Sequence, residues 1–387
     1  MANDAMRTGE LSLDHLYADL DRRMAYLRQQ HEPVNESRRI VKRALLDGDA
    51  HYGINTGFGV LANKRISRDD LAILQKNILL SHACGVGDPI PPEITRLMLQ
   101  LKIHSLSLGY SGVSEQTFMQ LLELEDKDIL PCIPSRGSVG ASGDLAPLAH
   151  MCLPLIGRGE VWDENFLAGV PAAAVLGAKG VKPIDLQAKD GLALINGTQM
   201  MAAYGAYVLE RTLTLQREAD LLAAMSLEAL QGSAAPFDAR IHRIRPHPGQ
   251  TAVAENIRKL LEHSEIMDSH LDCGRVQDPY CLRAAPQVLG AALDTIEHVR
   301  QVFARELGAV TDNPLVFTES HAVLSGGNFH AEPVAFAADF LALAIAEIGA
   351  LSERRIALLV DEHMSGLTAF LVEEGGLNSG FMMVQVT

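Results

Sequence analysis

The chain has 387 residues, of which 48% are hydrophobic, 21% are charged and only 5% are aromatic. This balance is typical of a globular protein rich in helix formers, and it excludes a disordered chain. The formal net charge of −15 argues against a nucleic-acid-binding protein, because binding to phosphates requires a dense basic surface.

The first part of the chain alternates helical patterns with one glycine-rich segment. Residues 1–50 have a polar helical pattern, whereas residues 52–59 contain too many glycines for a stable helix or a central strand. Ser67 and Asp70 have the spacing of a capping box, which predicts a helix that ends at His82. A further helix is expected to open at Pro91-Pro92.

The rest of the chain is dominated by two long helical segments. Residues 131–147 break the helical pattern, and residues 157–183 predict a small hairpin. Residues 191–232 are too long for one ordinary helix, so we expect one break there. Apolar residues circle the segment 332–360, which predicts a helix buried on most sides in a bundle with partners from other chains.

Several features of the sequence indicate the cellular compartment of the protein. Residues 1–13 have no signal-peptide pattern, and residues 334–351 carry Asp339 and Glu347, which favours a buried helix over a membrane span. The cysteines form no Cys-x-x-Cys pair, which is typical of free thiols in a reducing compartment, so we expect a cytoplasmic protein. The cysteines are Cys84, Cys132, Cys152, Cys273 and Cys281.

The common catalytic templates are missing from the sequence, which has no phosphate-binding loop, no dinucleotide fingerprint and no zinc motif. We therefore expect neither a metal nor a nucleotide cofactor. What stands out is the run from Gly137 to His150, with Gly140-Ala141-Ser142-Gly143-Asp144 at its centre and a helix expected near Pro147. Judged by composition alone, such a glycine and serine loop is a flexible connector.

This run resembles the signature of the aromatic amino-acid ammonia-lyase family. The resemblance implies that Ala141-Ser142-Gly143 cyclises to a 4-methylidene-imidazol-5-one (MIO), a built-in electrophile. The amide nitrogen of Gly143 would attack the carbonyl of Ala141, Ser142 would lose its hydroxyl, and Asp144 could assist the proton transfers. The flanking glycines would allow the compressed backbone that ring closure needs.

Two further segments fit the same family. The segment that begins at Tyr52 resembles its mobile loop, and the resemblance implies that Tyr52 is the base that removes the β-proton of the substrate. Considered alone, the tyrosine of a Tyr-Gly pair in a turn is a packing residue. Asn196, in Ile195-Asn196-Gly197, is by its spacing a helix cap, whereas the resemblance implies that it binds the amino-acid group of the substrate.

A third segment opens with Asp278-Pro279, which predicts a helix start and places Tyr280 and Arg283 one turn apart. A guanidinium there can hold a carboxylate with two parallel hydrogen bonds, although a surface ion pair is the ordinary role of a lone arginine. The resemblance implies that Gln277 and Tyr280 line the ring pocket and that Arg283 binds the carboxylate. In the family loop matched by residues 325–330, Phe329 is expected to pack beside the ring.

His82 bears on the substrate. A histidine at a helix end commonly satisfies the last carbonyl groups. In the family, however, this position and the next select the substrate side chain, and the pair His82-Ala83 is similar to the histidine-specific branch. A neutral imidazole can form a hydrogen bond with a substrate imidazole. The resemblance therefore implies elimination of ammonia from L-histidine to give trans-urocanate.

The sequence thus predicts a mainly α protein with a long-helix bundle, and by resemblance a homotetramer with sites shared between chains. We expect an N-terminal region, residues 1–110, with the tyrosine loop, and a bundle, residues 111–387, with the Ala-Ser-Gly loop. Residues 381–387 end the chain in an apolar run, so we expect that bundle to be incomplete. The alternatives are a tyrosine or phenylalanine lyase or aminomutase on the same scaffold, and a catalytically inactive assembly protein.

Overall fold

The computed structural model of the chain describes residues 11–47, 49–57, 59, 63–67, 70–271 and 276–387. Cys273, Phe58 and the first ten residues, on which parts of the sequence predictions rest, lie outside the described residues. The described part is mainly helical, which confirms the predicted fold class. The longer helices are α2 (Leu16–Leu27), α3 (Glu32–Ala44), α4 (Leu71–His82), α5 (Pro92–Ser107), α6 (Glu115–Asp126), α7 (Leu145–Cys152), α10 (Gln199–Ala229), α12 (Pro248–Leu260), α15 (Ala285–Leu307) and α16 (Glu332–Val360).

Short elements connect these helices. The short helices are α8 (Ala172–Ala178), α9 (Asp190–Ile195), α11 (Ala239–Arg243), α13 (Glu265–Ser269), α14 (Tyr280–Arg283), α17 (Glu362–Ser365) and α18 (Met382–Val386). Three antiparallel strand pairs occur among the described residues: β1 (Val86–Pro89) with β2 (Pro134–Arg136), β3 (Glu160–Trp162) with β4 (Gly169–Pro171), and β5 (Leu315–Phe317) with β6 (Ala322–Leu324). The pair β3–β4 is the hairpin expected within residues 157–183.

The chain divides into two compact units. Unit 1 contains residues 1–207 and 302–335, and unit 2 contains residues 208–301 and 336–387. Unit 1 extends beyond residue 110, the boundary placed by the sequence analysis. The physical reason is that α5, which precedes that position, packs against α6, which follows it.

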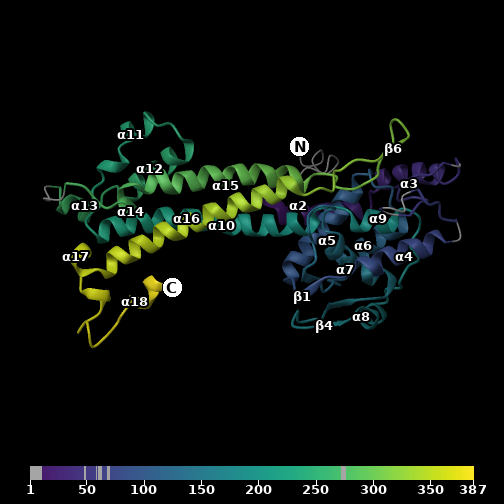
Figure 1. Ribbon diagram of the computed structural model, residues 1–387, viewed down its shortest axis with the longest axis horizontal. Coiled ribbons are helices and arrows are strands. Elements are labelled where there is room, and N and C mark those ends of the chain that lie inside the picture. Colours follow the sequence, from purple (N-terminus) through teal and green to yellow (C-terminus); the bar gives the residue numbers. More distant parts are fainter. Residues whose placement is uncertain (1–10, 48, 58, 60–62, 68–69, 272–275) are drawn as a thin grey trace. The chain divides into compact units, whose positions relative to one another are not determined.

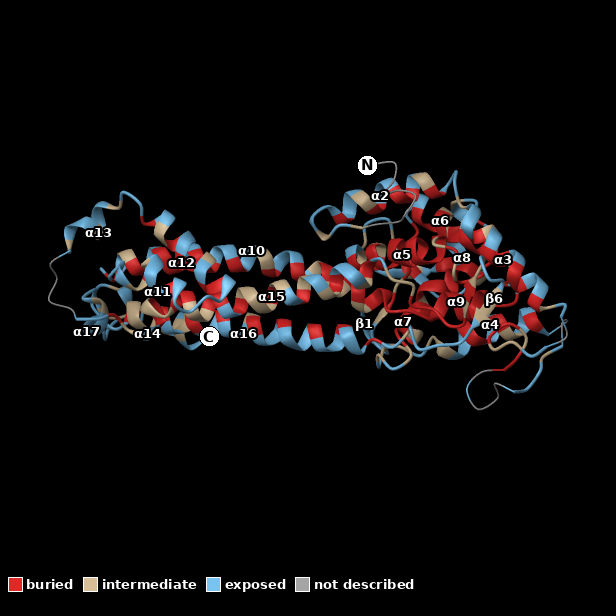
Figure 2. Cartoon of the chain, turned by 90° about the horizontal axis from the view of Figure 1, so that it is seen from above, coloured by how far each residue is buried: buried red, intermediate tan, exposed pale blue. Residues whose placement is uncertain are grey.

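The core of unit 1 is built around α5. Every residue of this helix from Leu97 to Ser107 is buried, because α2 and α6 both pack against it. Next to it, α7 packs against α4 and α9, and the buried residues of the unit gather on α5, α7 and α9 (Figure 2). This helical core carries the turn between α9 and α10, where the predicted break in the long helical segment is found.

In unit 2, the long stretches of α10, α15 and α16 run side by side (Figure 1). The sequence predicts that α16 is buried on most sides in a bundle with partners from other chains, and the single chain supplies part of that burial. Only one stripe of this helix is buried, and Phe336 and Leu343 are 58% and 68% exposed. Among the described helices, α16 alone has the length and apolar composition that could span a bilayer, although it carries Asp339 and Glu347.

A helical glycine in unit 1 provides a test of its packing. A Cβ at Gly205 of α10 would lie 1.9 Å from the ring of Phe303, which is 1% exposed. We therefore expect Gly205→Ala to lower the free energy of unfolding by about 2 kcal/mol, because the ring must move within a packed core. Urea unfolding followed by circular dichroism measures the change.

The matched control is Gly177→Ala in α8, where the described residues leave open space around a new Cβ. Alanine there should raise stability by about 0.5–1 kcal/mol, because it favours helix over glycine. If both variants gain stability, the close contact between Gly205 and Phe303 does not exist.

Candidate active site

A cavity of about 430 Å³ in unit 1 brings together several of the predicted residues. Its lining residues are Tyr52, Gly59, Ile78, His82, Ser142, Leu145, Leu192, Ile195, Asn196, Asn313, Ser325 and Phe329. These residues come from segments far apart in the sequence, and the helices α4, α7 and α9 hold the segments together. The structure therefore places Tyr52, His82, Ser142, Asn196 and Phe329 around one cavity, as the sequence analysis predicts.

The loop that carries Ser142 is a tight turn. Gly140 and Gly143 have φ angles of +73° and +71°, and the amide of Gly143 donates to the carbonyl of Gly140 at 3.4 Å. A Cβ at Gly143 would lie 2.2 Å from the carbonyl oxygen of Gly197. Because that close neighbour is backbone, only glycine fits. The bends on both sides of Ala141-Ser142, and the bare Cα of Gly143, fit the compressed backbone that cyclisation of Ala141-Ser142-Gly143 requires.

Asp144 joins this loop to α10. Its amide donates to the carbonyl of Gly197 at 2.7 Å, and its carboxylate accepts from the amides of Met200 and Met201 at 2.9 and 3.0 Å. The hydroxyl of Ser138 donates to the other carboxylate oxygen at 2.7 Å. Asp144 thus caps the N-terminus of α10 from another part of the chain. This role could not be predicted from the sequence, because Asp144 and Met200 are 56 residues apart.

Burial raises the pKa of the Asp144 carboxyl to about 6, against the hydrogen bonds from Met201, Ser138 and Met200, which favour the charged form. The side chain is fully buried. Its carboxylate is therefore charged at neutral pH and can become protonated in mild acid.

Asn196 follows α9 and does not cap α10. Its Nδ2 donates to the carbonyl oxygen of Asn313 at 2.8 Å and to Oδ1 of Asp312 at 3.3 Å. Asn313, whose Oδ1 accepts from the amide of Gly326, also lines the cavity. Asp312 and Asn313 are not among the residues predicted from the sequence, although the polar run Asp312-Asn313-Pro314 after a long helix is a signal that could have indicated them.

The ring of His82 is oriented by its own helix. Its Nδ1 lies 2.9 Å from the carbonyl oxygen of Ile78 and 3.0 Å from Oγ of Ser81. Because the carbonyl can only accept, the hydrogen bond to Ile78 forms in the neutral tautomer with the proton on Nδ1, which leaves Nε2 as an acceptor. The structure therefore combines the two expected roles of His82, because the residue satisfies a carbonyl at the end of α4 and also lines the cavity.

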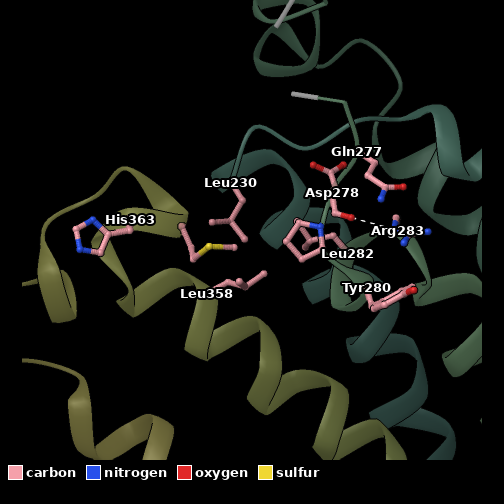
Figure 3. A pocket seen from close by; sticks show the side chains of 10 residues that line it. Leu230, Gln277, Asp278, Tyr280, Leu282, Arg283, Leu358 and His363 are labelled. Carbon is pink, nitrogen blue, oxygen red and sulfur yellow. Dashed lines mark hydrogen bonds between the residues drawn. The ribbon is translucent and has the colours of Figure 1, made fainter. Parts of the chain in front are cut away.

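Gln277, Tyr280 and Arg283 belong to unit 2, where they line another cavity of about 540 Å³. The guanidinium of Arg283 lies 4.3 Å from the centre of the Tyr280 ring, and its Nε donates to the carbonyl of Asp278 at 2.9 Å (Figure 3). The predicted arrangement of Tyr280 and Arg283 on one helical turn is confirmed. In neither cavity, nor elsewhere in the described residues, do three side chains gather as metal ligands would.

The sequence model of the aromatic amino acid lyase family matches residues 11–387. The chain belongs to this family. Membership in the family confirms the resemblance found in the sequence and the enzyme class that it implies, a carbon–nitrogen lyase. The matched residues include the tight Ala141-Ser142-Gly143 turn.

Relatives of known name fall in the same family. The chain is 55% identical to a histidine ammonia-lyase of Burkholderia multivorans over 342 residues, which cover 88% of this chain and 67% of the relative. It is 49% identical to a histidine ammonia-lyase of Legionella pneumophila, over 99% of this chain and 76% of the relative.

Solved structures agree with this fold. Histidine ammonia-lyase from Trypanosoma cruzi superposes with a TM-score of 0.83 at 42% identity, over 92% of this chain and 66% of that one. A tyrosine aminomutase from Streptomyces globisporus gives a TM-score of 0.86 at 35% identity, over 98% and 75%. The chain therefore spans about two thirds to three quarters of the length of these relatives.

The raised pKa of Asp144 predicts how stability depends on pH. The folded carboxyl binds a proton between pH 3.8 and about 6, where the unfolded one is already charged, so stability should fall as the pH rises through that window. Relative to Asp144→Asn, the unmodified protein should lose about 2 kcal/mol between pH 4 and pH 7. Urea unfolding at several pH values measures this, and a pH-independent difference between the two proteins would contradict it.

Proposed function

We propose that this chain is a histidine ammonia-lyase, which eliminates ammonia from L-histidine to give trans-urocanate without oxidation. The observation that carries the proposal is that His82, Tyr52 and Ser142 line one cavity. The acceptor Nε2 of His82 suits the N–H group of a substrate imidazole. The names of the relatives support the same substrate.

We propose that the MIO group forms from Ala141-Ser142-Gly143. The Gly143 nitrogen bonds to the Ala141 carbonyl carbon, whose oxygen leaves as water, and the Ser142 hydroxyl leaves as a second water. The tight turn between Gly140 and Gly143 supports this closure. The group then supplies an electrophilic carbon that serves as an electron sink, which proteins otherwise obtain from a bound cofactor.

The residues around the cavity have distinct tasks in this proposal. His82 holds the substrate imidazole, Phe329 packs beside the ring and Asn196 binds the amino-acid group. Tyr52 removes the β-proton, since its side chain lines the same cavity as Ser142. In this proposal, positioning of the β-carbon and the preformed electrophile together supply most of the rate acceleration.

In this proposal the carboxylate of the substrate binds to Arg283, which lies in unit 2 with Gln277 and Tyr280. We propose that these residues complete the cavity of another copy of the chain, within a homotetramer. The apolar side chains exposed on α10 and α16 support this assembly, because such surfaces usually mark contacts between chains. They include Leu215, Leu222, Met225, Phe336, Phe340 and Leu343.

We further propose that the protein acts in the cytoplasm. The four described cysteines are free thiols, as is usual in a reducing compartment.

Ring formation is tested by the intact mass of the purified chain. We expect a mass two waters below that of the sequence, and loss of both this deficit and all turnover of L-histidine in Ser142→Ala. The circular dichroism spectrum of that variant should stay unchanged, since Ser142 is only half-buried. Turnover by the variant would contradict the proposal, whereas an unmodified chain at full mass would favour the inactive assembly protein.

The role of His82 is tested by His82→Leu. The variant removes the acceptor for the substrate imidazole, so we expect kcat/KM for L-histidine to fall about 10- to 100-fold while the mass deficit stays. L-Tyrosine and L-phenylalanine are assayed beside L-histidine, and faster turnover of either one by the unmodified enzyme would favour the other aromatic lyases.

The matched control is His247→Leu, at an exposed histidine whose side chain caps no helix. This variant should retain full activity. An equal loss of activity in both variants would show that His82 has no specific role.

A further inference from the structure

A group of buried charges lies directly behind Asn196. Lys102 of α5, Lys189 before α9 and Asp312 after α15 are 1%, 0% and 3% exposed, and all belong to unit 1. None of them lines the cavity. Burying ions in a protein interior costs free energy, so the contacts of these three side chains are what can explain their presence.

Their contacts converge on Asn196. The ammonium of Lys102 donates to the backbone carbonyl of Asn196 at 2.5 Å. One oxygen of Asp312 pairs with the ammonium of Lys189 at 2.8 Å, and the other accepts from Nδ2 of Asn196. Both the backbone and the side chain of Asn196 are thus held from behind the cavity wall.

These contacts decide which way the Asn196 amide faces. Its two partners, the Asp312 carboxylate and the Asn313 carbonyl, can only accept hydrogen bonds, so the nitrogen must point toward them. Both N–H groups are used, and Oδ1 forms no hydrogen bond with any described residue. Asn196 therefore offers the cavity an acceptor and no donor, which suits an amine and not a carboxylate.

Lys102 remains a cation at neutral pH despite its burial. Desolvation lowers the pKa of its ammonium to about 8, against the opposing effect of the nearby Asp312 carboxylate. An apolar side chain of similar length would avoid the free-energy cost of burying the ammonium. What the lysine provides instead is a hydrogen-bond donor from α5 to the backbone carbonyl of Asn196, at the end of α9.

We propose that Lys102 and Asp312 are positioning residues that hold Asn196 as a hydrogen-bond acceptor for the amino group of the substrate. This inference rests on the proposed function, because the substrate amine is the ligand that it assigns to Asn196. It also separates the two ends of the amino acid, with the amine at Asn196 and the carboxylate at Arg283.

Binding without turnover tests the proposal. In the Ser142→Ala background, isothermal titration calorimetry measures the Kd of histamine, which has the amine but no carboxylate, and of imidazolepropionate, which has the carboxylate but no amine. We expect Lys102→Met to weaken histamine binding about tenfold, the size of one hydrogen bond to a charged group, and to leave imidazolepropionate unchanged. Asp312→Asn should have the same selective effect, and it carries the test if Lys102→Met does not fold.

The matched control is Arg23→Met, which also removes a buried cation next to α5, where Arg23 donates to Ser107. It should change neither Kd. A double-mutant cycle adds Lys102→Met to Asn196→Ala, and no further loss of histamine binding is expected, because the lysine acts through the asparagine.

Equal weakening of both ligands by Lys102→Met, or no weakening of either, would overturn the positioning role. Additive losses in the double-mutant cycle would overturn it as well. If the Ser142→Ala protein binds neither ligand before any further change, the proposed function fails, and the assignment of the amine to Asn196 fails with it.

Discussion

The cap that Asp144 places on α10 is the interaction on which the rest of the site depends. A long helix begins with unpaired amides and a partial positive charge, and a buried carboxylate satisfies both. Because Asp144 directly follows Gly143, this one side chain also anchors the loop of Ala141 and Ser142. The hydrogen bond from the Asp144 amide to the Gly197 carbonyl then holds the turn between α9 and α10, which contains Asn196, beside that loop.

Polar groups behind the cavity wall orient the side chains that the helices bring to the cavity. α4, α7 and α9 supply a rigid apolar frame, and His82 and Asn196 lie at the ends of α4 and α9. At such ends the backbone carbonyl groups are free to orient side chains. His82 is oriented by the carbonyl of Ile78, and Asn196 by the buried ions around Asp312. Both side chains thereby present acceptors to the cavity.

The two units divide the chemistry of the proposed reaction. Unit 1 contains the loop, the tyrosine and the residues that receive the imidazole and the amine, whereas unit 2 contains Arg283 stacked against Tyr280. The stacking and the bond from Arg283 to Asp278 hold the guanidinium before a ligand arrives, which lowers the entropy cost of binding. The exposed apolar face of α16 is consistent with a site completed by a second chain.

Local sequence patterns determined much of this protein. The helical composition, the ends of α4 and α16, the break before α10 and the Ala141-Ser142-Gly143 loop all follow from residues close together in the chain, whose effects on the backbone are local. Only the tertiary structure decided that Asp144 caps α10, that Asp312 and Lys102 orient Asn196, and that α16 buries a single stripe. Those features depend on contacts between residues distant in the sequence, and no local pattern specifies which buried partner a polar side chain will meet.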